Sequence, residues 1–407
     1  MLWLAGYDIV SAMKTINGGT ITSPKGFLAG ATTAGLKTKG GPDLGILCSE
    51  KPCVVVGMFT ANKVKAAPVA WSQGRVAAGK AQAIVVNAGC ANACTGEPGL
   101  ADTAEMAALA AKKLKLKAED VLVASTGVIG QRLPMGRIAA GLKDISLSVD
   151  GGHDLARAIM TTDTFPKEIA VAADDGSFTI GGIAKGAGMI HPDMGTMLCF
   201  IATDASVDRA MLDKALRQAV DVSFNMITID GDTSPNDTVF LLANGKAGRI
   251  KSGIKVAKEF QAALTEVCTY LARCIARDGE GATKMISVTV ERALSLADAR
   301  AAARTIVGSP LVKAAIHGCD PNWGRIIAAV GRSGCDFDGA KIDLFLNDIC
   351  VVRGGVAHYF DKKEVSLLMS GTEVSVQVSL NLGEWQATAW GCDLSAEYVS
   401  MNAEYST

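Results

Sequence analysis

Short runs of apolar residues alternate along the chain with longer segments in which apolar positions recur with a helical period. The apolar runs predict β-strands at residues 54–58, 83–87, 121–124, 168–173, 178–183, 197–202, 226–229, 343–352 and 374–382. The periodic segments predict helices at residues 155–161, 208–222 and 256–277, and one after Asp102, which forms a capping box with Glu105. Strands and helices alternate without a linker-like stretch, so the sequence predicts an α/β protein.

Composition narrows the class of protein. Hydrophobic residues make up 49% of the 407 positions, enough for a sizeable core. The net charge is −1 and no charged block occurs, which disfavours nucleic acid or a membrane surface as partner. No apolar run reaches the roughly 18 residues of a membrane-spanning helix. The start, MLWLAGYDIVSAMK, has no positively charged region, so we interpret it as an extension rather than a signal peptide.

Cysteine and histidine usage points to a cytoplasmic protein without a metal centre. The eleven cysteines are odd in number and scattered through apolar runs, with no Cys-x-x-Cys pair, which favours free thiols in a reducing compartment. The four histidines are isolated from one another, so a zinc site is not expected. Residues 230–238, DGDTSPNDT, lack the spacing of a calcium loop, and we interpret them as a hydrogen-bonded loop.

The stretch 182–200, GIAKGAGMIHPDMGTMLCF, contains the first candidate chemistry. It places Thr196 between a flexible turn and a predicted strand. A threonine in that position can attack the carbonyl of Gly195 in an N-to-O acyl shift, and hydrolysis of the ester frees its amine. That amine, with a reference pKa of about 7.7–8.0, can then activate the hydroxyl as a nucleophile. Spacing alone favours a glycine-rich turn that ends in a strand-capping threonine, because Gly-Thr dipeptides are common.

A second candidate is the small-residue loop 125–130, STGVIG, which follows a predicted strand. Such a loop can direct a backbone N–H and a hydroxyl to one point, as an oxyanion hole requires. Without other information, the same residues are interpreted as a turn.

Several motifs together resemble the glutamate N-acetyltransferase/ornithine acetyltransferase family of arginine biosynthesis. The family motif Lys-Gly-x-Gly-Met-Ile-x-Pro-x-Met-Ala-Thr-Met-Leu matches residues 185–198, with Gly195 in place of alanine. The other motifs that match are PKGF at 24–27, FTAN at 59–62, ANACTG at 91–96, DGDTS at 230–234, GEGATK at 279–284, CDPNWGR at 319–325 and the tail 402–407. The family has Ser and Asn where this chain has Ala88 and Cys90. The resemblance covers about residues 18–407.

The resemblance implies a fold of α-β-β-α layers and self-cleavage before Thr196, which divides the chain into fragments 1–195 and 196–407. It implies that Thr196 is the nucleophile and that Thr126 and Gly127 form the oxyanion hole. The substrate-binding residues that it implies are Thr162 (with Thr161 as the alternative), Lys185, Thr196, Glu280, Asn402 and Thr407. Lys185 suits the carboxylate of an amino acid, and Glu280 suits its ammonium group.

The activity that follows from the resemblance is acetyl transfer from N2-acetylornithine to glutamate, without a metal or redox cofactor. Whether acetyl-CoA is a second donor stays open, because no phosphate-binding motif distinguishes the two activities. The family implies a heterotetramer of two N-terminal and two C-terminal fragments. Two alternatives remain: an N-terminal-nucleophile amidohydrolase or aminopeptidase that passes the acyl group to water, and an unprocessed, non-catalytic binding subunit.

Overall fold

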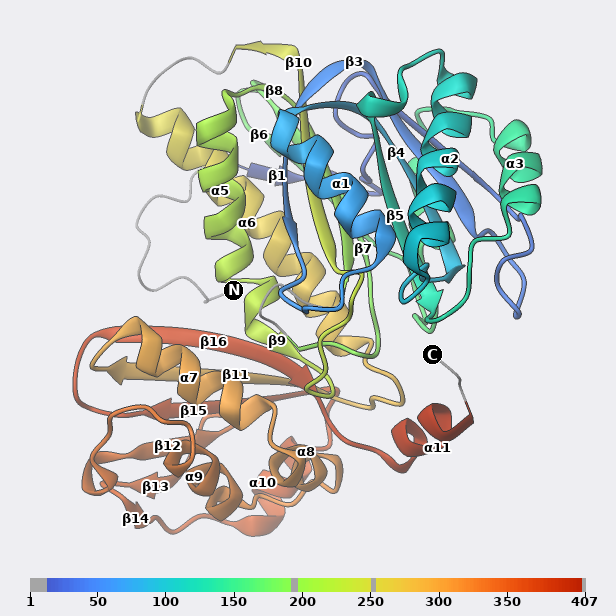
Figure 1. Cartoon of the computed structure of the whole chain (residues 1–407). Coiled ribbons are helices and arrows are strands. Elements are labelled where there is room, and N and C mark those ends of the chain that lie inside the picture. Colours follow the sequence, from blue (N-terminus) through green and yellow to red (C-terminus); the bar gives the residue numbers. More distant parts are fainter. Residues whose placement is uncertain (1–12, 192–196, 250–253, 405–407) are drawn as a thin grey trace.

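Two mixed β-sheets organise the chain in a computed structural model that describes residues 13–191, 197–249 and 254–404 (Figure 1). The larger sheet has the strand order β1-β6-β7-β8-β10-β3-β4-β5, with β2 paired to β3. Its strands are β1 (Met13–Thr15), β2 (Phe27–Thr32), β3 (Leu44–Phe59), β4 (Lys80–Cys90), β5 (Val121–Val128), β6 (Lys167–Ala173), β7 (Thr179–Lys185), β8 (Leu198–Ser206) and β10 (Thr238–Arg249). The pairs β4–β5 and β8–β10 are parallel.

The larger sheet curves so that its two halves share one inner core. Alternate residues of each strand face that core, because side chains of a strand point to opposite faces: Ile84 of β4 and Phe200 of β8 lie inside, and Val85 and Ile201 lie outside. The helix α4 (Gly152–Ala158) contacts β2 and β3 as well as β6 and β7. Those strand pairs are separated by β8 and β10, so the sheet must bend around the helix.

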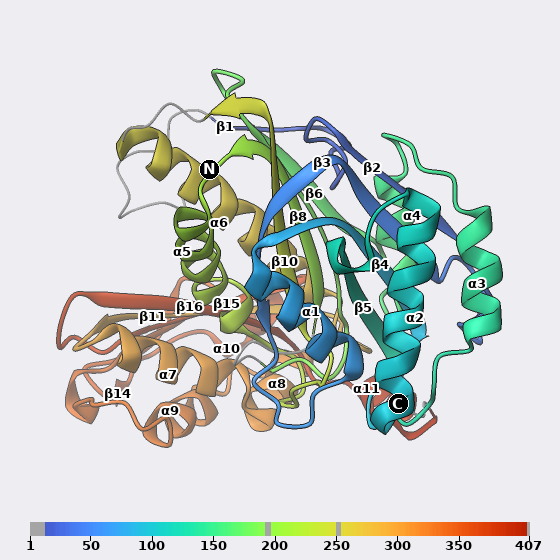
Figure 2. The same ribbon diagram turned by 45° about the horizontal axis from the view of Figure 1, so that its top comes forward.

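Different helices cover the two outer faces of the curved sheet (Figure 2). The helices α2 (Gly96–Leu114) and α3 (Met135–Asp144) pack outside β4 and β5, beside α1 (Ala67–Ala78). The helices α5 (Arg209–Asp221) and α6 (Ile254–Arg277) pack outside the other half. The layer order is therefore the predicted α-β-β-α, and the α/β class is confirmed.

The smaller sheet has the order β14-β13-β12-β15-β11-β16-β9. Its strands are β9 (Ile227–Thr228), β11 (Met285–Ala293), β12 (Asp343–Leu346), β13 (Ile349–Arg353), β14 (Val356–Ala357), β15 (Glu373–Ser379) and β16 (Trp385–Cys392). The helices beside it are α7 (Leu296–Val307), α8 (Pro310–His317), α9 (Trp323–Gly331) and α10 (Lys362–Leu368). One hydrophobic cluster joins this sheet to α5 and α6, so the two sheets share a continuous core. The last helix, α11 (Ala396–Glu404), runs back from the smaller sheet toward β5 (Figure 1).

Two sequence predictions about elements were wrong. Asp102 does not cap α2, which begins six residues earlier at Gly96; Pro98 is tolerated there because the first turn needs no donor from it. Asp102 instead occupies a buried position within α2. Both of its carboxylate oxygens accept hydrogen bonds from the Arg132 guanidinium, at 2.6 and 2.9 Å. The run 343–352 is a hairpin rather than one strand, because Asn347 and Asp348 both adopt positive φ, as a tight turn requires.

No helix within the described ranges is long and apolar enough to cross a membrane.

Candidate functional site

The end of β7 brings Lys185 beside the start of β8. Lys185 pairs in register with Leu198, and the backbone N–H of Thr238 on β10 donates to the carbonyl of Met197 at 2.9 Å. The chain therefore enters β8, a central strand of the larger sheet, directly after the predicted cleavage segment. Gly195 and Thr196 themselves, like Thr407 at the chain end, lie outside the described residues.

Lys185 and Thr126 meet at the edge of the inner core. The ammonium Nζ of Lys185 donates to the hydroxyl oxygen of Thr126 at 3.2 Å, and both side chains are buried. Burial lowers the pKa of Lys185, helped by the charge of Lys167, while the carboxylates of Asp163, Asp237 and Glu280 oppose that shift. The two residues come from motifs that the sequence analysis identified separately, and the fold brings them into contact.

Gly127 follows Thr126 at a point where only glycine fits. Its φ is +126°, and a β-carbon there would lie 2.3 Å from the carbonyl carbon of Gly89 on the neighbouring strand β4. The backbone of β5 thus approaches β4 more closely than a side chain permits. Ala88 is fully buried beside this contact, and the nearly buried thiol of Cys90 donates to the carbonyl of Gln131 at 3.2 Å. The two positions that depart from the family pattern therefore lie on β4 directly beside the part of β5 that carries Thr126 and Gly127.

A buried group of charges supports the end of β7, and sequence reasoning missed it. Lys167 donates to Asp163 at 2.7 Å and to Asp278 at 2.5 Å, and all three side chains are almost fully buried. Asp163 also accepts the N–H of Gly186, the residue after Lys185, at 2.6 Å. Burial alone would raise the pKa of Asp163, but the charges of Lys167 and Lys185 and the Gly186 N–H together hold it below its usual range.

Thr162 precedes Asp163 and is half-buried. Its hydroxyl makes no hydrogen bond within the described ranges, whereas the backbone N–H of Thr161 donates to Asp163 at 2.9 Å. The side chain of Thr162 is thus available for another partner, whereas the backbone of Thr161 is engaged in holding the loop.

Glu280 reaches the same region from the loop after α6. Its backbone N–H donates to the carbonyl of Ala187 at 2.9 Å, and its carboxylate packs against Gly188, where a β-carbon would lie 2.5 Å from Oε2. The exposed Asn402 of α11 donates from Nδ2 to Glu280 Oε2 at 2.8 Å. The hydroxyl of Ser395 donates to the carbonyl of Gly281 at 2.6 Å, which fixes the start of α11 to the same loop.

The loop 230–238 is a hydrogen-bonded support, as predicted. The carboxylate of Asp230 accepts the N–H groups of Met189 at 2.6 Å and Ile190 at 2.9 Å, and Met189 has a φ of +55°. The amide of Asn236 donates to the carbonyls of Ala91 at 2.7 Å and Ser125 at 2.9 Å. This loop therefore holds both the segment before residue 192 and the strand that carries Thr126.

Within the described residues, no three His, Cys, Asp or Glu side chains gather in the manner of a metal site. The structure instead places the Lys185 ammonium group and the Glu280 carboxylate, groups of the charges that could bind the two ends of an amino acid, in the region of Thr126.

The chain is similar in sequence to a known protein family over most of its length. A family model described as the ArgJ family matches residues 28–407. The arginine biosynthesis bifunctional protein ArgJ of Dehalococcoides mccartyi is 54% identical over 98% of this chain and 100% of its own length. The protein of the same name from Symbiobacterium thermophilum is 51% identical over 97% and 100%. A solved structure of ornithine acetyltransferase complexed with ornithine, from Mycobacterium tuberculosis, is 41% identical, covers 44% of this chain and 98% of its own, and has a TM-score of 0.42.

Proposed function

The chain belongs to the ArgJ family of bifunctional arginine-biosynthesis proteins, and on that premise we propose how the residues around Lys185 carry out its reaction. The enzyme is an acetyltransferase of arginine biosynthesis: it moves an acetyl group from N2-acetylornithine to glutamate, and it also acetylates glutamate with acetyl-CoA. Its substrates are therefore amino acids. The residue roles and the cleavage below are proposals.

The contact between Lys185 and Thr126 is the observation that carries the mechanism. Because Lys185 donates to the hydroxyl oxygen of Thr126, the proton of that hydroxyl is free to point at another acceptor. We assign that acceptor as the oxygen of the acetyl carbonyl, which becomes an oxyanion in the transition state. The backbone N–H of Gly127 is the second donor.

The acyl transfer then proceeds in two halves. The hydroxyl oxygen of Thr196 attacks the acetyl carbonyl carbon of N2-acetylornithine, and the α-amine of Thr196 takes the hydroxyl proton. When the tetrahedral intermediate collapses, that proton passes to the leaving nitrogen, ornithine departs, and an acetyl-threonine ester remains. The amine of glutamate attacks the ester carbonyl, and the reverse proton transfer restores Thr196 and releases N-acetylglutamate.

Residues around the oxyanion hole orient the amino-acid substrates. An ammonium group has three donors, so Lys185 can hold the substrate carboxylate while it also donates to Thr126. The carboxylate of Glu280 accepts a hydrogen bond from the substrate ammonium group. Asn402 holds that Glu280 carboxylate in place. Thr162, next to Asp163 in the chain, contributes its hydroxyl, and Thr407 completes the set.

Self-cleavage between Gly195 and Thr196 supplies the α-amine that the mechanism needs, so fragments 1–195 and 196–407 act as one folded unit. Two of each assemble as a heterotetramer, which a native mass measurement would test. The cytoplasm is the proposed compartment; all eleven cysteines are free, which supports a reducing environment.

The decisive experiment supplies N2-acetylornithine without glutamate or acetyl-CoA. The mechanism expects a burst of one ornithine per active site that then stops, and the fragment that begins with Thr196 gains the mass of one acetyl group. Continued release of ornithine and acetate at the full rate would instead show that water is the acceptor, as in a hydrolase. In the Thr126→Val variant, the burst should form far more slowly.

A further inference from the structure

The loop 279–284 connects α6 to β11 and carries Glu280. The end of β16 lies along this loop and contacts it on both sides of Glu280. On one side, a β-carbon at Gly279 would lie 2.5 Å from the sulfur of Cys392, the last residue of β16. On the other side, the loop is hydrogen-bonded to Asp393. The backbone position of Glu280 is therefore determined by protein contacts that do not involve the substrate.

The carboxylate of Asp393 is the main partner of the loop and is fully buried. It accepts the N–H of Thr283 at 2.8 Å, the hydroxyl of the same residue at 2.6 Å and the N–H of Lys284 at 2.9 Å. The Nδ1 atom of His317, at the end of α8, lies 2.7 Å from the same carboxylate. Burial alone would raise the pKa of Asp393, but these hydrogen bonds hold it below its usual range. The carboxylate is therefore ionised, and His317 is the donor.

The end of α8 is fixed by the CDPNWGR motif, which the proposed reaction does not use. Cys319 has a φ of +51°, and the N–H of Asp320 donates to the carbonyl of Ala315 at 2.9 Å, an arrangement that ends a helix sharply. The carbonyl of His317 accepts the ammonium group of Lys284 at 2.9 Å, where a cation also suits the negative end of the helix. His317 is thus bound to the Glu280 loop through its backbone and, by way of Asp393, through its side chain.

We propose that His317 and Asp393 are positioning residues for the binding of N2-acetylornithine, because they hold the loop 279–284 at the place where Glu280 meets the substrate ammonium group. This rests on the proposed role of Glu280 in binding that group. Asn402 orients the tip of the Glu280 side chain, whereas Asp393 fixes the backbone from which the side chain extends. Hydrogen bonds weaken steeply with distance and angle. A loosened loop should therefore bind the substrate less tightly and affect KM more than kcat.

The test is steady-state kinetics with N2-acetylornithine as donor and glutamate as acceptor. His317→Ala should raise the KM for N2-acetylornithine by about fivefold, with a smaller change in kcat. The histidine side chain is 40% exposed, so its removal should leave the enzyme folded. His317→Asn should recover most of the lost affinity, because the amide nitrogen of asparagine can donate in place of Nδ1. A KM equal to that of the wild type in His317→Ala would overturn the inference.

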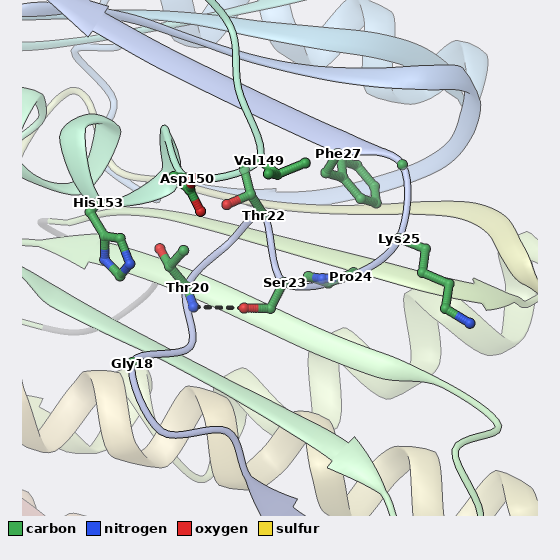
Figure 3. A pocket seen from close by; sticks show the side chains of 11 residues that line it. Gly18, Thr20, Thr22, Ser23, Pro24, Lys25, Phe27, Val149, Asp150 and His153 are labelled. Carbon is green, nitrogen blue, oxygen red and sulfur yellow. Dashed lines mark hydrogen bonds between the residues drawn. The ribbon is translucent and has the colours of Figure 1, made fainter.

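A double variant separates positioning from a general loss of stability. If His317 acts through Glu280, then His317→Ala should add little to the KM of Glu280→Gln, whereas effects that multiply would overturn the inference. His153→Ala is the matched control, since His153 Nδ1 also lies 2.9 Å from a carboxylate, that of Glu168, and its side chain is 38% exposed. His153 stands at the start of α4 and lines a cavity of about 350 Å³, whose lining includes neither Glu280 nor Lys185 (Figure 3). An equal rise of KM in both histidine variants would also overturn the inference.

Hydrogen exchange distinguishes failure of this inference from failure of the role of Glu280. In His317→Ala without substrate, the backbone amides of Glu280 and Thr283 should exchange faster than in the wild type, because the loop has lost a support. If they do so while Glu280→Gln keeps the KM of the wild type, the loop is positioned as inferred and only the role of Glu280 fails. Unchanged exchange in His317→Ala would overturn the inference, whatever the kinetics of Glu280→Gln.

Discussion

The amide nitrogen of Asn402 donates to the Glu280 carboxylate at 2.8 Å, although 122 positions separate the two residues in the sequence. Asn402 also donates to the carbonyl of Tyr398 one turn earlier in α11, at 3.0 Å, so its side chain is fixed at both sides. The same carboxylate packs against Gly188, in the segment that leads to the proposed cleavage site. The helix α11 therefore sets the position of the Glu280 carboxylate, for which we propose a role in substrate binding.

We predict that Asn402→Ala raises the KM for N2-acetylornithine by roughly tenfold, the equivalent of about 1.4 kcal/mol, with a smaller effect on kcat. The reason is that Glu280 loses the donor that orients it. Self-cleavage should persist, because α11 only supports the substrate. Steady-state kinetics and a denaturing gel measure the two effects. Ser400→Ala is the matched control, since the Ser400 hydroxyl donates to Ala396 within the same helix; an equal loss in both variants would contradict the role of Asn402.

Removal of the hydroxyl from Thr126 should affect the chemical step. Thr126→Val is expected to lower kcat by about 10²–10³-fold, the usual loss for one oxyanion donor, with little change in KM. Thr126→Ser keeps the hydroxyl beside Lys185 and should retain most of the activity. A strong rise in KM with kcat preserved would instead identify Thr126 as a residue that binds the ground state of the substrate.

The sequence predicted the parts of this site that belong to recognisable local motifs, and it missed the parts that depend on packing. Thr126, Lys185 and Glu280 were each placed in a motif, and the structure brings Lys185 to Thr126 and Asn402 to Glu280. Lys167 and Asp278 left no such signal, because a lysine that begins a strand and an aspartate after a helix are ordinary surface residues in a sequence. Their burial depends on how α6 and β6 pack, which no local pattern encodes.

Misassigned elements had a similar cause. The apparent capping box at Asp102 fitted local helix rules, but the aspartate is instead buried and binds the exposed guanidinium of Arg132, 30 positions away. In the hairpin of β12 and β13, Asn347 and Asp348 are typical turn residues, yet the apolar residues on both sides made the whole run look like one strand.

Cleavage before Thr196 is the most direct prediction from the sequence. N-terminal sequencing of the active enzyme should give a second start that reads Thr-Met-Leu-Cys. Thr196→Ala should yield one intact, inactive chain of 42.1 kDa, because neither the acyl shift nor the acetyl ester can form without the hydroxyl. Thr196→Ser keeps the hydroxyl and should still be cleaved. An active enzyme that consists only of the intact chain would refute the processing model.

Alanine variants of Gly127 and Gly130 can distinguish the cost of an unfavourable φ from the cost of a steric clash. Gly127→Ala is expected to destabilise the fold by roughly 3 kcal/mol or more, because the new β-carbon would meet the backbone of Gly89 and the φ is unfavourable for alanine. Gly130→Ala is the control: its φ is +82°, but nothing lies within 4 Å of a β-carbon there. We expect a loss of only about 1 kcal/mol for that variant. Thermal or urea denaturation compares the two, and equal losses would show that the contact with Gly89 is unimportant.

The change in folding stability at acid pH should show that the buried carboxylate of Asp163 is ionised in the folded enzyme. Its pKa is held below the ordinary value of 3.8 by Lys167, Lys185 and the N–H of Gly186, against the opposing effect of burial. A carboxylate whose pKa is lower in the folded state than in the unfolded state stabilises the fold fully above its unfolded pKa. That stabilisation is lost as the pH falls through the folded pKa. The contribution should therefore be constant near neutral pH and should diminish only below about pH 4.

Asp163→Asn should thus lower the free energy of unfolding by roughly 3 kcal/mol at pH 7, since Lys167 keeps Asp278 but loses one of its two buried partners. Urea denaturation at pH 7, 5 and 3.5 should give the same difference from the wild type at the first two values and a smaller one at the third. Asp154→Asn is the control, because that carboxylate is 63% exposed in its pair with Arg157 and should change stability little at any pH. If the deficit of Asp163→Asn grew in acid, Asp163 would be protonated in the folded enzyme at neutral pH, and its carboxylate would not be the group that holds Lys167 and Gly186 at the end of β7.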